Sequence, residues 1–266
     1  MIILKVGGGK NIRWDYIAED VFALLKKQPV VIVHGANAIR DEIANRLSQP
    51  VKRITSPSGI ESTYTDKVAL EIMLMTYAGI ANKTIVAKLL GNQIPAVGLT
   101  GVDGKLWEAK RKRYIYMKDE GKTKLISDSY TGRVEKVNSK LIRTLIRNKY
   151  VPVICPPAIS FDNEIVNTDN DWAVMVMASA LKVKEIVMLF EAPGLLKNFG
   201  DESSLIRKVS CEELHSKLEH SRGTMKKKIL GAEYALKHGV RKIYWGDGRI
   251  KNPVINAMKG NGTVIS

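Results

Sequence analysis

The stretch that decides the fold is MIILKVGGGK, residues 1–10, in which an apolar run with one lysine leads into three glycines. Met1–Val6 predicts a buried strand because it is short, rich in β-formers and bounded by glycine. Gly7, Gly8 and Gly9 can adopt positive φ angles and carry no Cβ, so their N–H groups can approach an anion such as a phosphate. The spacing is neither the Walker pattern nor GxGxxG, so a plain strand-to-helix turn also fits.

The next forty residues repeat this arrangement. Trp14–Lys27 has apolar residues at helical spacing, Val30–Val33 predicts a second strand, and His34–Asn37 is a second turn of small residues before a helix over Ala38–Leu47. Strand, turn and helix in this rhythm are typical of a parallel α/β sheet with crossover helices. Anions bind at the ends of strands in such sheets, so we expect both turns to open on one crevice.

The remaining periodicity predicts alternating strands and helices, with a polar, Asx-rich turn at Asn163–Ala173 and a strand that stops at Pro156-Pro157. The predicted strands are Ile94–Leu99, Val151–Ile154, Glu185–Phe190 and Arg241–Trp245, and the predicted helices are Lys67–Tyr77 (interrupted at Gly79, resuming to Leu90), Val134–Asn148, Trp172–Leu181, Cys211–Leu218 and Met225–Lys237. We find no repeat or linker, so any two lobes share one continuous sheet.

Composition separates classes of partner. The 266 residues carry a formal net charge of +15 with a sequence pI near 9.7, which favours an acidic protein, a polyanionic small molecule or a nucleic acid as partner. No zinc-finger, RNP or helix-turn-helix signature accompanies the charge, which weakens the nucleic-acid interpretation but leaves it open. The sequence lacks a membrane span and a signal peptide, so a cytosolic protein is expected, with Cys155 and Cys211 as reduced thiols.

Seven motifs occur in register along the chain: KVGG, VHGA, YTD, GLTGVDG, NTDNDWA, APGLL and GTMKKKILGA. Together they resemble the amino acid kinase family, and more narrowly its acetylglutamate-kinase-like branch. The resemblance implies an open αβα sandwich with a mainly parallel sheet. It also implies an N-terminal lobe (1–172) for the acyl substrate and dimer contacts, a C-terminal lobe (173–266) for ATP with Mg²⁺, no metal held by the protein itself, and a homodimer.

A narrower likeness concerns kinases whose substrate is attached to a carrier protein. The run Tyr130–Asn138, the Pro156-Pro157-Ala158 turn and the spacing of Asn167–Asp171 resemble the LysW-aminoadipate and LysW-glutamate kinases of lysine and arginine biosynthesis. The implied reaction phosphorylates the side-chain carboxylate of carrier-bound 2-aminoadipate, and of carrier-bound glutamate as a second substrate. Two alternatives stay open: a kinase for free N-acetylglutamate, and a basic nucleic-acid-binding or regulatory protein on a kinase-like scaffold.

The family pattern implies three catalytic residues. Lys5 corresponds to the lysine that stabilises the transferring phosphoryl group, Lys228 to a second lysine reaching the phosphates from the nucleotide side, and Asp171 to the carboxylate that orients both. Gly7 and Gly8 are expected to supply backbone donors around the phosphates. From physics alone, Lys226 and Lys227 are as good candidates as Lys228, because only one of three adjacent lysines on a helix can face the site.

The same pattern places contacts to the acyl substrate and to the nucleotide. The substrate-binding residues are Gly35, Ala36, Thr63 and Asn167, and the nucleotide-binding residues are Phe190, Pro193, Gly194, Leu195 and Met225. One position departs from the family, since Thr63 stands where close relatives carry an arginine that would grip the substrate α-carboxylate. Either another cation, such as Arg53 or Lys67, replaces it, or the α-side of the substrate is recognised differently.

The positive charge also suggests where a carrier would bind. The basic segment Lys105–Lys124 carries Tyr114 and Tyr116 and alternates like a hairpin projecting from a sheet edge. Lys110, Arg111, Lys112 and Arg113 form its densest part and are the predicted docking patch for an acidic carrier such as LysW, captured by electrostatic steering. Two plainer interpretations are an edge whose lysines deter aggregation and a lysine-rich surface of a thermophilic protein.

Overall fold

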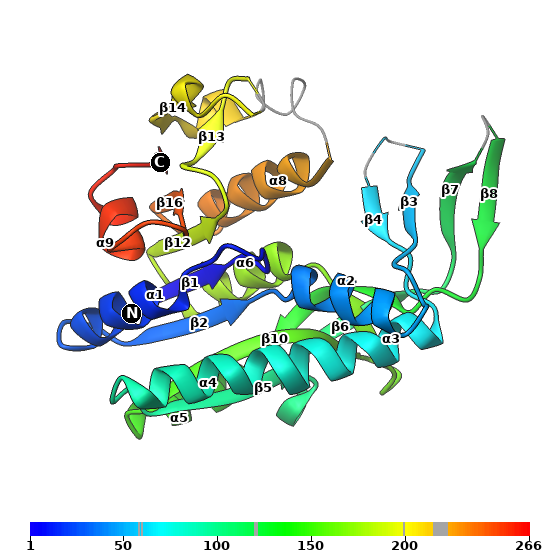
Figure 1. Ribbon diagram of the computed structural model, residues 1–266, viewed down its shortest axis with the longest axis horizontal. Coiled ribbons are helices and arrows are strands. Elements are labelled where there is room, and N and C mark those ends of the chain that lie inside the picture. The colour runs from blue at the N-terminus through cyan, green and yellow to red at the C-terminus, as the bar shows by residue number, and fades with distance from the viewer. Residues whose placement is uncertain (58, 60, 120–121, 199, 215–222) are drawn as a thin grey trace.

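The computed structural model describes residues 1–266 except 58, 60, 120–121, 199 and 215–222, and a large sheet runs through it (Figure 1). Its strand order is β11-β9-β6-β10-β2-β1-β12-β16-β17-β15, with β5 also paired to β10. The strands of this sheet are β1 (Ile2–Val6), β2 (Val30–His34), β5 (Ala96–Gly101), β6 (Trp107–Lys112), β9 (Thr131–Val137), β10 (Val151–Ser160), β11 (Ile165–Thr168), β12 (Glu185–Phe190), β15 (Lys208–Val209), β16 (Lys242–Asp247) and β17 (Thr263–Ile265). The central pairs are parallel, as predicted.

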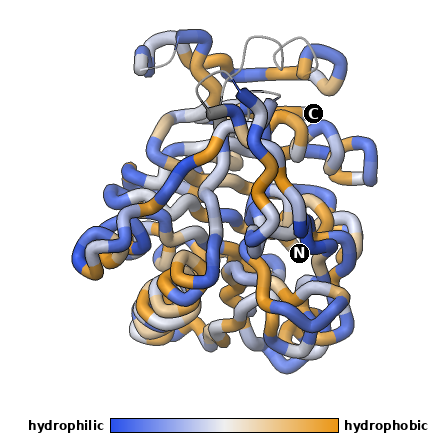
Figure 2. The backbone as a smooth tube through the Cα atoms, turned by 90° about the vertical axis from the view of Figure 1, so that its right-hand side faces the viewer, coloured by the Kyte–Doolittle hydropathy of each residue, from blue (hydrophilic) through white to orange (hydrophobic). Residues whose placement is uncertain are grey.

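Helices cover both faces of the sheet, which makes the expected αβα sandwich. The helices are α1 (Trp14–Leu25), α2 (Asn37–Arg46), α3 (Lys67–Met73), α4 (Asn82–Gly91), α5 (Ser139–Arg147), α6 (Asn170–Leu181), α8 (Gly223–Lys237) and α9 (Pro253–Met258). A large apolar cluster joins the sheet to α1, α4 and α9, and a second large cluster joins it to α5, α6 and α8. Figure 2 shows apolar stretches running through the centre and hydrophilic ones along the outer turns.

The alternation of side chains along β1 decides which face each one serves. Ile2, Leu4 and Val6 pack in the cluster that contains α1, and Ile3 packs in the cluster that contains α6 and α8. Successive residues of a strand point to opposite faces, so Lys5 points to the same face as Ile3. The one charged residue of β1 is thereby directed at α6 and α8.

The long helix that begins after Asp66 is continuous, contrary to the predicted interruption at Gly79. Asp66 caps its N-terminus by accepting a hydrogen bond from the N–H of Ala69, and α3 passes into a π-helical segment, η1 (Leu74–Ala81), before α4. Thr76 Oγ1 donates to the carbonyl oxygens of Ile72 and Met73. The wider turns absorb the glycine without ending the helix.

Two further predictions near the cleft are wrong. Val134–Asn148 is not one helix: its first residues form β9, paired to β6, and α5 begins only after Asn138, whose Oδ1 accepts from the N–H of Leu141. The strand predicted to stop at Pro156-Pro157 continues as β10 through a cis peptide bond between the prolines. Its ladder partners change across them, from β5 and β2 to β6 and β11, so the missing proline N–H groups fall between two sets of pairings.

A four-stranded antiparallel sheet of order β4-β3-β7-β8 projects from the sandwich at the right of Figure 1, and we call it the arm. It contains β3 (Arg53–Thr55), β4 (Glu61–Thr63), β7 (Ile115–Asp119) and β8 (Lys122–Ile126). The predicted hairpin over Lys105–Lys124 is therefore wrong in extent, because Trp107–Lys112 belongs to the main sheet as β6. Smaller elements are η2 (Asp103–Lys105), η3 (Glu202–Ser204) and the ribbon β13 (Leu195–Leu196) with β14 (Leu205–Ile206).

Three further sequence predictions can be compared with the described residues. The segment predicted as a helix over Cys211–Leu218 is helical at residues 211–214, and its remainder lies outside the described residues. The predicted lobe boundary at residue 172 falls inside α6, which is continuous across it. Among the described residues, no helix is both long and apolar enough to cross a bilayer.

Candidate active site

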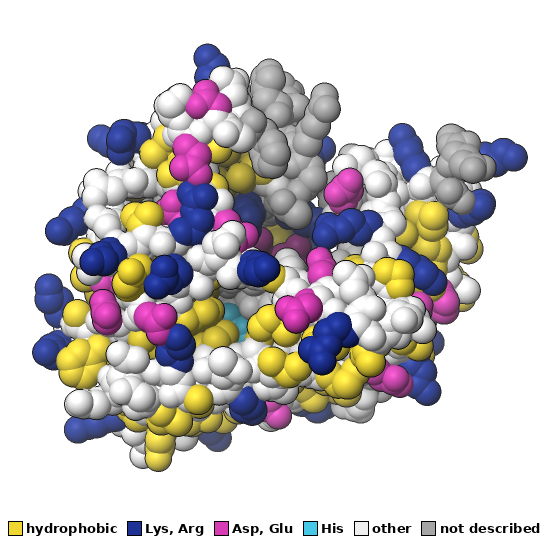
Figure 3. All heavy atoms as spheres, viewed as in Figure 1, with side chains coloured by type: hydrophobic (Ala, Val, Ile, Leu, Met, Phe, Trp, Pro, Cys, Tyr) yellow, Lys and Arg dark blue, Asp and Glu magenta, His cyan; other side chains and the backbone are white. Residues whose placement is uncertain are grey.

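A cleft of about 1050 Å³ opens between the C-terminal elements and the arm, and Figure 3 shows basic and acidic side chains around the hollow on this face. The two glycine-containing turns, the start of α6, the end of β12, and α8 all contribute to its lining. Both turns therefore open on one crevice, as the strand and helix rhythm predicted. The volume exceeds the roughly 300–1,000 Å³ of typical ligand pockets, which is room for two substrates.

Lys5, Asp171 and Lys228 meet at the floor of this cleft. Lys5 Nζ forms an ion pair with Asp171 Oδ1 at 2.5 Å, and Lys228 Nζ donates a hydrogen bond to Asp171 Oδ2 at 2.5 Å. Three residues from β1, α6 and α8, far apart in the sequence, thus form one compact group.

The group is nearly dry, and burial works against each of its charges. Burial raises the pKa of Asp171, but the Lys228 and Lys5 ammonium groups outweigh it and hold this pKa well below its ordinary value. The pKa of Lys228 is raised because its pairing with Asp171 outweighs burial, whereas burial lowers the pKa of Lys5 despite Asp171. Two ammonium groups share one carboxylate, so the group carries an excess positive charge that an anion can neutralise.

The start of α6 explains why Asp171 faces both lysines. Asp169 caps the helix by accepting hydrogen bonds from the N–H groups of Asp171 and Trp172 at 2.9 and 3.1 Å. This cap fixes the first turn, in which Asp171 is buried, and the rest of α6 is almost entirely buried against the sheet. Lys227 Nζ lies 3.8 Å from Asp169 Oδ2, so of the three adjacent lysines it is Lys228 that pairs with Asp171.

The two small-residue turns touch each other. A Cβ at Gly8 would lie 2.4 Å from the backbone nitrogens of Ala36 and Asn37, so no other residue fits. Gly8 O accepts from the N–H of Ala38 at 2.9 Å. Some of the expected anion donors are already used within the fold, which corrects the sequence prediction. The N–H of Gly7 donates to Leu189 O, and the N–H of Gly35 donates to Val6 O.

A buried histidine supports the second turn. Asn82 Nδ2 lies 3.0 Å from His34 Nε2, and His34 Nδ1 lies 3.2 Å from the carbonyl oxygen of Gly35. These partners fit a neutral imidazole that donates from Nδ1 and accepts at Nε2. Burial lowers the pKa of His34 to about 4, so the ring adds no charge to the cleft near neutral pH.

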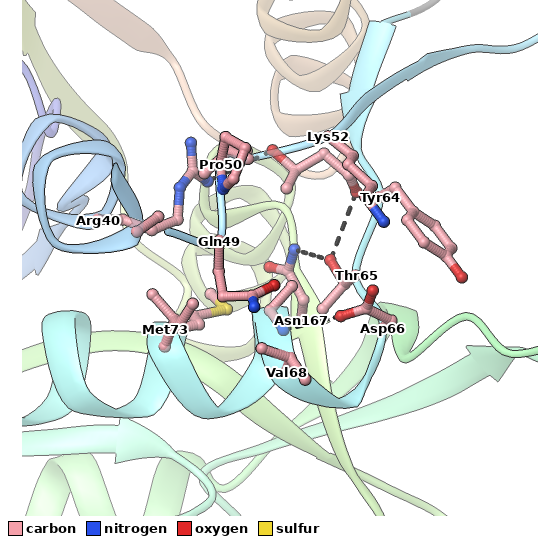
Figure 4. Close-up of a pocket in the computed structure, with 15 residues that line it drawn as sticks. Arg40, Gln49, Pro50, Lys52, Tyr64, Thr65, Asp66, Val68, Met73 and Asn167 are labelled. Atoms are coloured by element: carbon pink, nitrogen blue, oxygen red, sulfur yellow. Dashed lines mark hydrogen bonds between the residues drawn. The ribbon is translucent and has the colours of Figure 1, made fainter. Parts of the chain in front are cut away.

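The cleft lining also contains the predicted substrate residues Thr63 and Asn167, together with an arginine that the sequence argument missed. Arg40 of α2 donates from Nη1 to Thr63 Oγ1 at 3.3 Å, and Asn167 Nδ2 donates to Thr65 Oγ1 at 2.9 Å. Arg40, Thr63 and Asn167 line both the cleft and a smaller side pocket, which Figure 4 shows with the Arg40 side chain extending from α2. The one signal for Arg40 in the sequence is that it lies three positions after Asn37 on the same helix, and Asn37 also lines the cleft.

The two cations proposed from the sequence as replacements for the family arginine differ in position. Arg53 lines the cleft, with its guanidinium largely exposed and 3.8 Å from Asp41 Oδ2. Lys67 is exposed and is absent from the lining of the cleft. Arg53 therefore stays a candidate on position, and Lys67 does not.

Of the five predicted nucleotide-binding residues, Phe190 lines the cleft, and Lys228 Nζ lies 5.4 Å from the centre of its ring. Leu195 is buried, and its N–H donates to Thr263 Oγ1 at 2.8 Å. Gly194 lies so close to Thr263 that a Cβ would clash with its hydroxyl. Pro193, Gly194, Leu195 and Met225 are absent from the cleft lining formed by the described residues.

The four residues of the predicted carrier patch do not form one surface. Arg111 is partly buried, pairs with Glu164 at 2.5 Å and stacks on the ring of Tyr130 at 4.2 Å. Arg113 pairs with Asp162 at 3.2 Å. Lys112 lines the cleft, and Lys110 is exposed. Alternation along β6 separates Arg111 from Lys110 and Lys112 and directs it to a structural role.

The arrangement is suited to anion chemistry. Within the described ranges, no group of three or more histidine, cysteine, aspartate and glutamate side chains could hold a metal ion. The cleft instead offers fixed ammonium groups at its floor and a guanidinium elsewhere in its lining. Positioned cations of this kind can bring two anionic reactants together and stabilise charge that develops between them.

Sequence comparisons identify proteins similar along the whole chain. A family model described as the amino acid kinase family matches residues 1–245. A LysW-aminoadipate kinase of Thermus thermophilus is 37% identical over 268 residues, covering 100% of both chains. The corresponding kinase of Deinococcus radiodurans is 39% identical, covering 100% of this chain and 91% of its own. A LysW-aminoadipate/LysW-glutamate kinase of Saccharolobus solfataricus is 34% identical, covering 100% and 99%.

Solved structures agree on the fold. The N-acetylglutamate synthase of Neisseria gonorrhoeae, complexed with coenzyme A and N-acetyl-glutamate, superposes with a TM-score of 0.79 at 21% identity; the match covers all of this chain and 59% of the synthase chain. The carbamate kinase of Giardia lamblia bound to AMP-PNP gives a TM-score of 0.66 at 15% identity, covering 99% and 97% of the two chains. At these identities the likeness concerns the fold alone.

Proposed function

This chain belongs to the amino acid kinase family, and we propose that it phosphorylates the side-chain carboxylate of 2-aminoadipate, or of glutamate, attached to the acidic carrier protein LysW. The product would be an acyl phosphate in lysine or arginine biosynthesis, made in the cytoplasm. The support is twofold: the full-length likeness to kinases named for this reaction, and the cleft geometry. The observation that carries the chemistry is the pair of buried lysines on one aspartate.

The reaction needs charge neutralisation more than proton transfer. A carboxylate oxygen forms a bond to the γ-phosphorus of ATP, the bond from that phosphorus to the bridging oxygen breaks, and ADP leaves. The carboxylate is already ionised, so no base is required, but both reactants are anions. Lys5 and Lys228, held by Asp171, would stabilise the charge on the transferring phosphoryl group and on the departing ADP.

The nucleotide would bind on the side of β12 and α8, with its phosphates toward Lys228 and Gly8. Phe190 and Lys228 line this side of the cleft, which fits the division into an acyl-substrate lobe and a nucleotide lobe. We expect Mg²⁺ to enter bound to ATP, whose phosphate oxygens are the hard ligands that this ion prefers. The protein's own cations would then act on the oxygens that the ion leaves uncovered.

The carrier would approach from the arm. Lys118 and Lys122 are exposed on it, and Tyr114 and Tyr116, which line the cleft, are 65% and 58% exposed. With a net charge of +15, this surface suits an acidic carrier that inserts its amino-acid-bearing end between the arm and the sandwich. Lys110 and Lys112, on neighbouring β6, would extend the same field.

The chain would act as a homodimer through the long helix formed by α3, η1 and α4. Val68, Met75, Ile80 and Leu90 expose apolar side chains along it. Apolar residues repeated on one helix mark a protein interface better than scattered ones do. Light scattering of the purified chain measures the dimer, and replacing Ile80 by lysine should shift the mass toward the monomer.

The test supplies ATP with LysW-aminoadipate, LysW-glutamate or free N-acetylglutamate and traps acyl phosphate with hydroxylamine. The proposal expects hydroxamate from a carrier-bound substrate and none from the free amino acid. Product from N-acetylglutamate alone would replace the proposal with a free-amino-acid kinase. The absence of product from all three, with unchanged ATP, would reject both. Lys228→Met serves as the inactive control, because it removes a phosphate-facing ammonium while leaving the Lys5–Asp171 pair.

A further inference from the structure

Arg40 occupies the part of the cleft wall that Thr63 leaves open. Its side chain is only 10% exposed, and its guanidinium contacts Thr63, one position before the Tyr64-Thr65-Asp66 segment that starts the long helix. The two residues are on different elements, α2 and β4. A threonine at position 63 is short enough to let a guanidinium from α2 reach this place, and the hydroxyl then holds that guanidinium by accepting a hydrogen bond.

The hydrogen bonds of Arg40 leave a defined pair of donors. Asp41 Oδ1 accepts from Nε at 2.8 Å and from Nη2 at 2.7 Å, and Thr63 Oγ1 accepts from Nη1. A guanidinium has five N–H donors, so two have no partner among the described residues, one on each terminal nitrogen. Each terminal nitrogen therefore keeps one N–H group that can donate to a carboxylate oxygen.

The surroundings fit an anion. Arg40 lines the cleft that also contains Lys5, Asp171 and Lys228, and it borders the side pocket in Figure 4. Asn167, at the same junction, bonds to Thr65 and thereby ties β11 to the segment beside Arg40. Asp41 offsets part of the charge but is 40% exposed, so its interaction with Arg40 is weakened by water.

We infer that Arg40, positioned by Thr63 and Asp41, binds the α-carboxylate of the amino-acid substrate. The inference rests on the proposed function. An amino acid joined to a carrier through its amino group keeps two carboxylates: the ω-carboxylate that accepts the phosphoryl group and the α-carboxylate, which needs a cation of its own. The lysine pair serves the first, and Arg40, elsewhere in the lining of the same cleft, serves the second.

Arg53 is the competing assignment, and two observations place it second. Its guanidinium is 60% exposed, and its contact with Asp41 is 3.8 Å rather than a hydrogen bond. An exposed, loosely held guanidinium pays more side-chain entropy on binding than one already fixed by two partners. Arg40 is therefore the better preorganised of two arginines that share one aspartate.

The experiment removes the α-carboxylate from the substrate as well as the arginine from the protein. Carrier-linked 5-aminopentanoate has the same chain and ω-carboxylate as carrier-linked 2-aminoadipate but lacks the α-carboxylate. We expect the wild type to prefer aminoadipate by about 10- to 100-fold in kcat/KM, the range for hydrogen bonds to a charged group. Arg40→Met should lose this preference, because its loss of kcat/KM falls on the substrate that carries the α-carboxylate.

Three variants make the result specific. Arg53→Met is the matched control and should keep the preference, and Arg40→Lys should keep only part of it, because an ammonium lacks the second donor nitrogen. In the Arg40→Met background, Thr63→Arg should restore it by supplying the guanidinium from β4. A preference that survives Arg40→Met, or disappears only in Arg53→Met, overturns the inference. If Arg40→Met fails to fold, Arg40→Lys decides: an undiminished preference overturns the inference.

Failure of this inference is distinguishable from failure of the proposed function. The latter is decided by whether the wild type uses a carrier-bound substrate at all. If it uses N-acetylglutamate instead, the same comparison runs with N-acetylglutamate against 4-acetamidobutanoate, which lacks the α-carboxylate. The preference of each variant for the carboxylated substrate then tests Arg40 under either outcome.

Discussion

The floor of the cleft and the arm are both rich in positive charge, yet they are built in opposite ways. Lys5 and Lys228 are largely buried, pair with one carboxylate and rest on elements that pack in the core. The basic residues of the arm lie on short strands that project from the sandwich, with their side chains in water. One region fixes the positions of two charges, and the other spreads charge over a surface.

The difference follows from what each task requires. Stabilising a transition state needs donors within a fraction of an ångström of their target, and only packed elements hold them so. Attracting a charged partner depends on the summed field, which tolerates movement and substitution but is screened by salt. We therefore expect changes in the floor to act steeply on kcat or stability, and changes in the arm to act gently on KM.

The largest effect is expected at the floor of the cleft. Lys228→Met should lower kcat by about 100- to 1000-fold, since one preorganised donor to the transferring group is lost. Lys226→Met, two residues earlier on α8, is the matched control and should stay within a few-fold of the wild type. Steady-state kinetics with saturating ATP and acceptor measure both. Equal losses in the two variants would mean that the pairing with Asp171 has no catalytic meaning.

Burial of His34 should also appear as a pH dependence of stability. The pKa of His34 is lowered to about 4 in the folded chain from an ordinary 6.5, so between these values the unfolded chain binds the extra proton. Stability should fall as the pH drops through this window, by about 3 kcal/mol in total. Urea unfolding from pH 7.5 to 4.5 measures it. A His34→Asn variant should lose this part of the slope, and an unchanged slope would count against a buried, neutral ring.

A smaller effect tests the contact between the two turns. Gly8→Ala would place a Cβ 2.4 Å from two backbone nitrogens and force the turns apart, at a cost of about 1–3 kcal/mol in stability together with a loss of kcat. Gly91→Ala is the control, because no atom lies within 4 Å of the added Cβ. Thermal unfolding and initial rates measure both. A Gly8→Ala variant as active and stable as the control would show that the turns need not touch.

The smallest effect is expected in the arm. The double variant Lys118→Glu/Lys122→Glu should raise the KM for the carrier-bound substrate by about 3- to 10-fold at low salt, with the difference fading by about 0.5 M salt. Its kcat and KM for ATP should not change. Reversing Lys27 and Lys259, which are exposed on the α1 and α9 side, is the control with equal charge change. A similar rise in the control would indicate net charge rather than a docking surface.

Local pattern accounts for the elements on which the site is built. The apolar run of β1, the small-residue turns and the helical periodicity of α1 and α6 were predictable, because strand and helix periods depend on neighbouring residues. The family resemblance supplied Lys5, Asp171 and Lys228. Periodicity alone did not distinguish Lys228 from Lys226 and Lys227. The structure then placed Lys5 and Lys228 on the two oxygens of Asp171.

Other features depended on pairing between distant segments. Residues 134–137 carry a helical pattern, yet they form β9 because β6 offers a strand to pair with. The N–H groups of Gly7 and Gly35 are used by strand carbonyls, and the basic residues of β6 separate onto two faces.

The sequence by itself therefore determined the class of fold and the reaction chemistry, while tertiary structure decided which charges meet. Arg40 and Thr63 are 23 positions apart and on different elements, and neither carries a signal for the other. Helix and strand periodicity depends on residues that are close in the sequence, whereas contacts across the cleft depend on how the helices and strands pack together. The contact between Arg40 and Thr63, on which the proposed substrate assignment rests, is visible only after α2 and β4 come together.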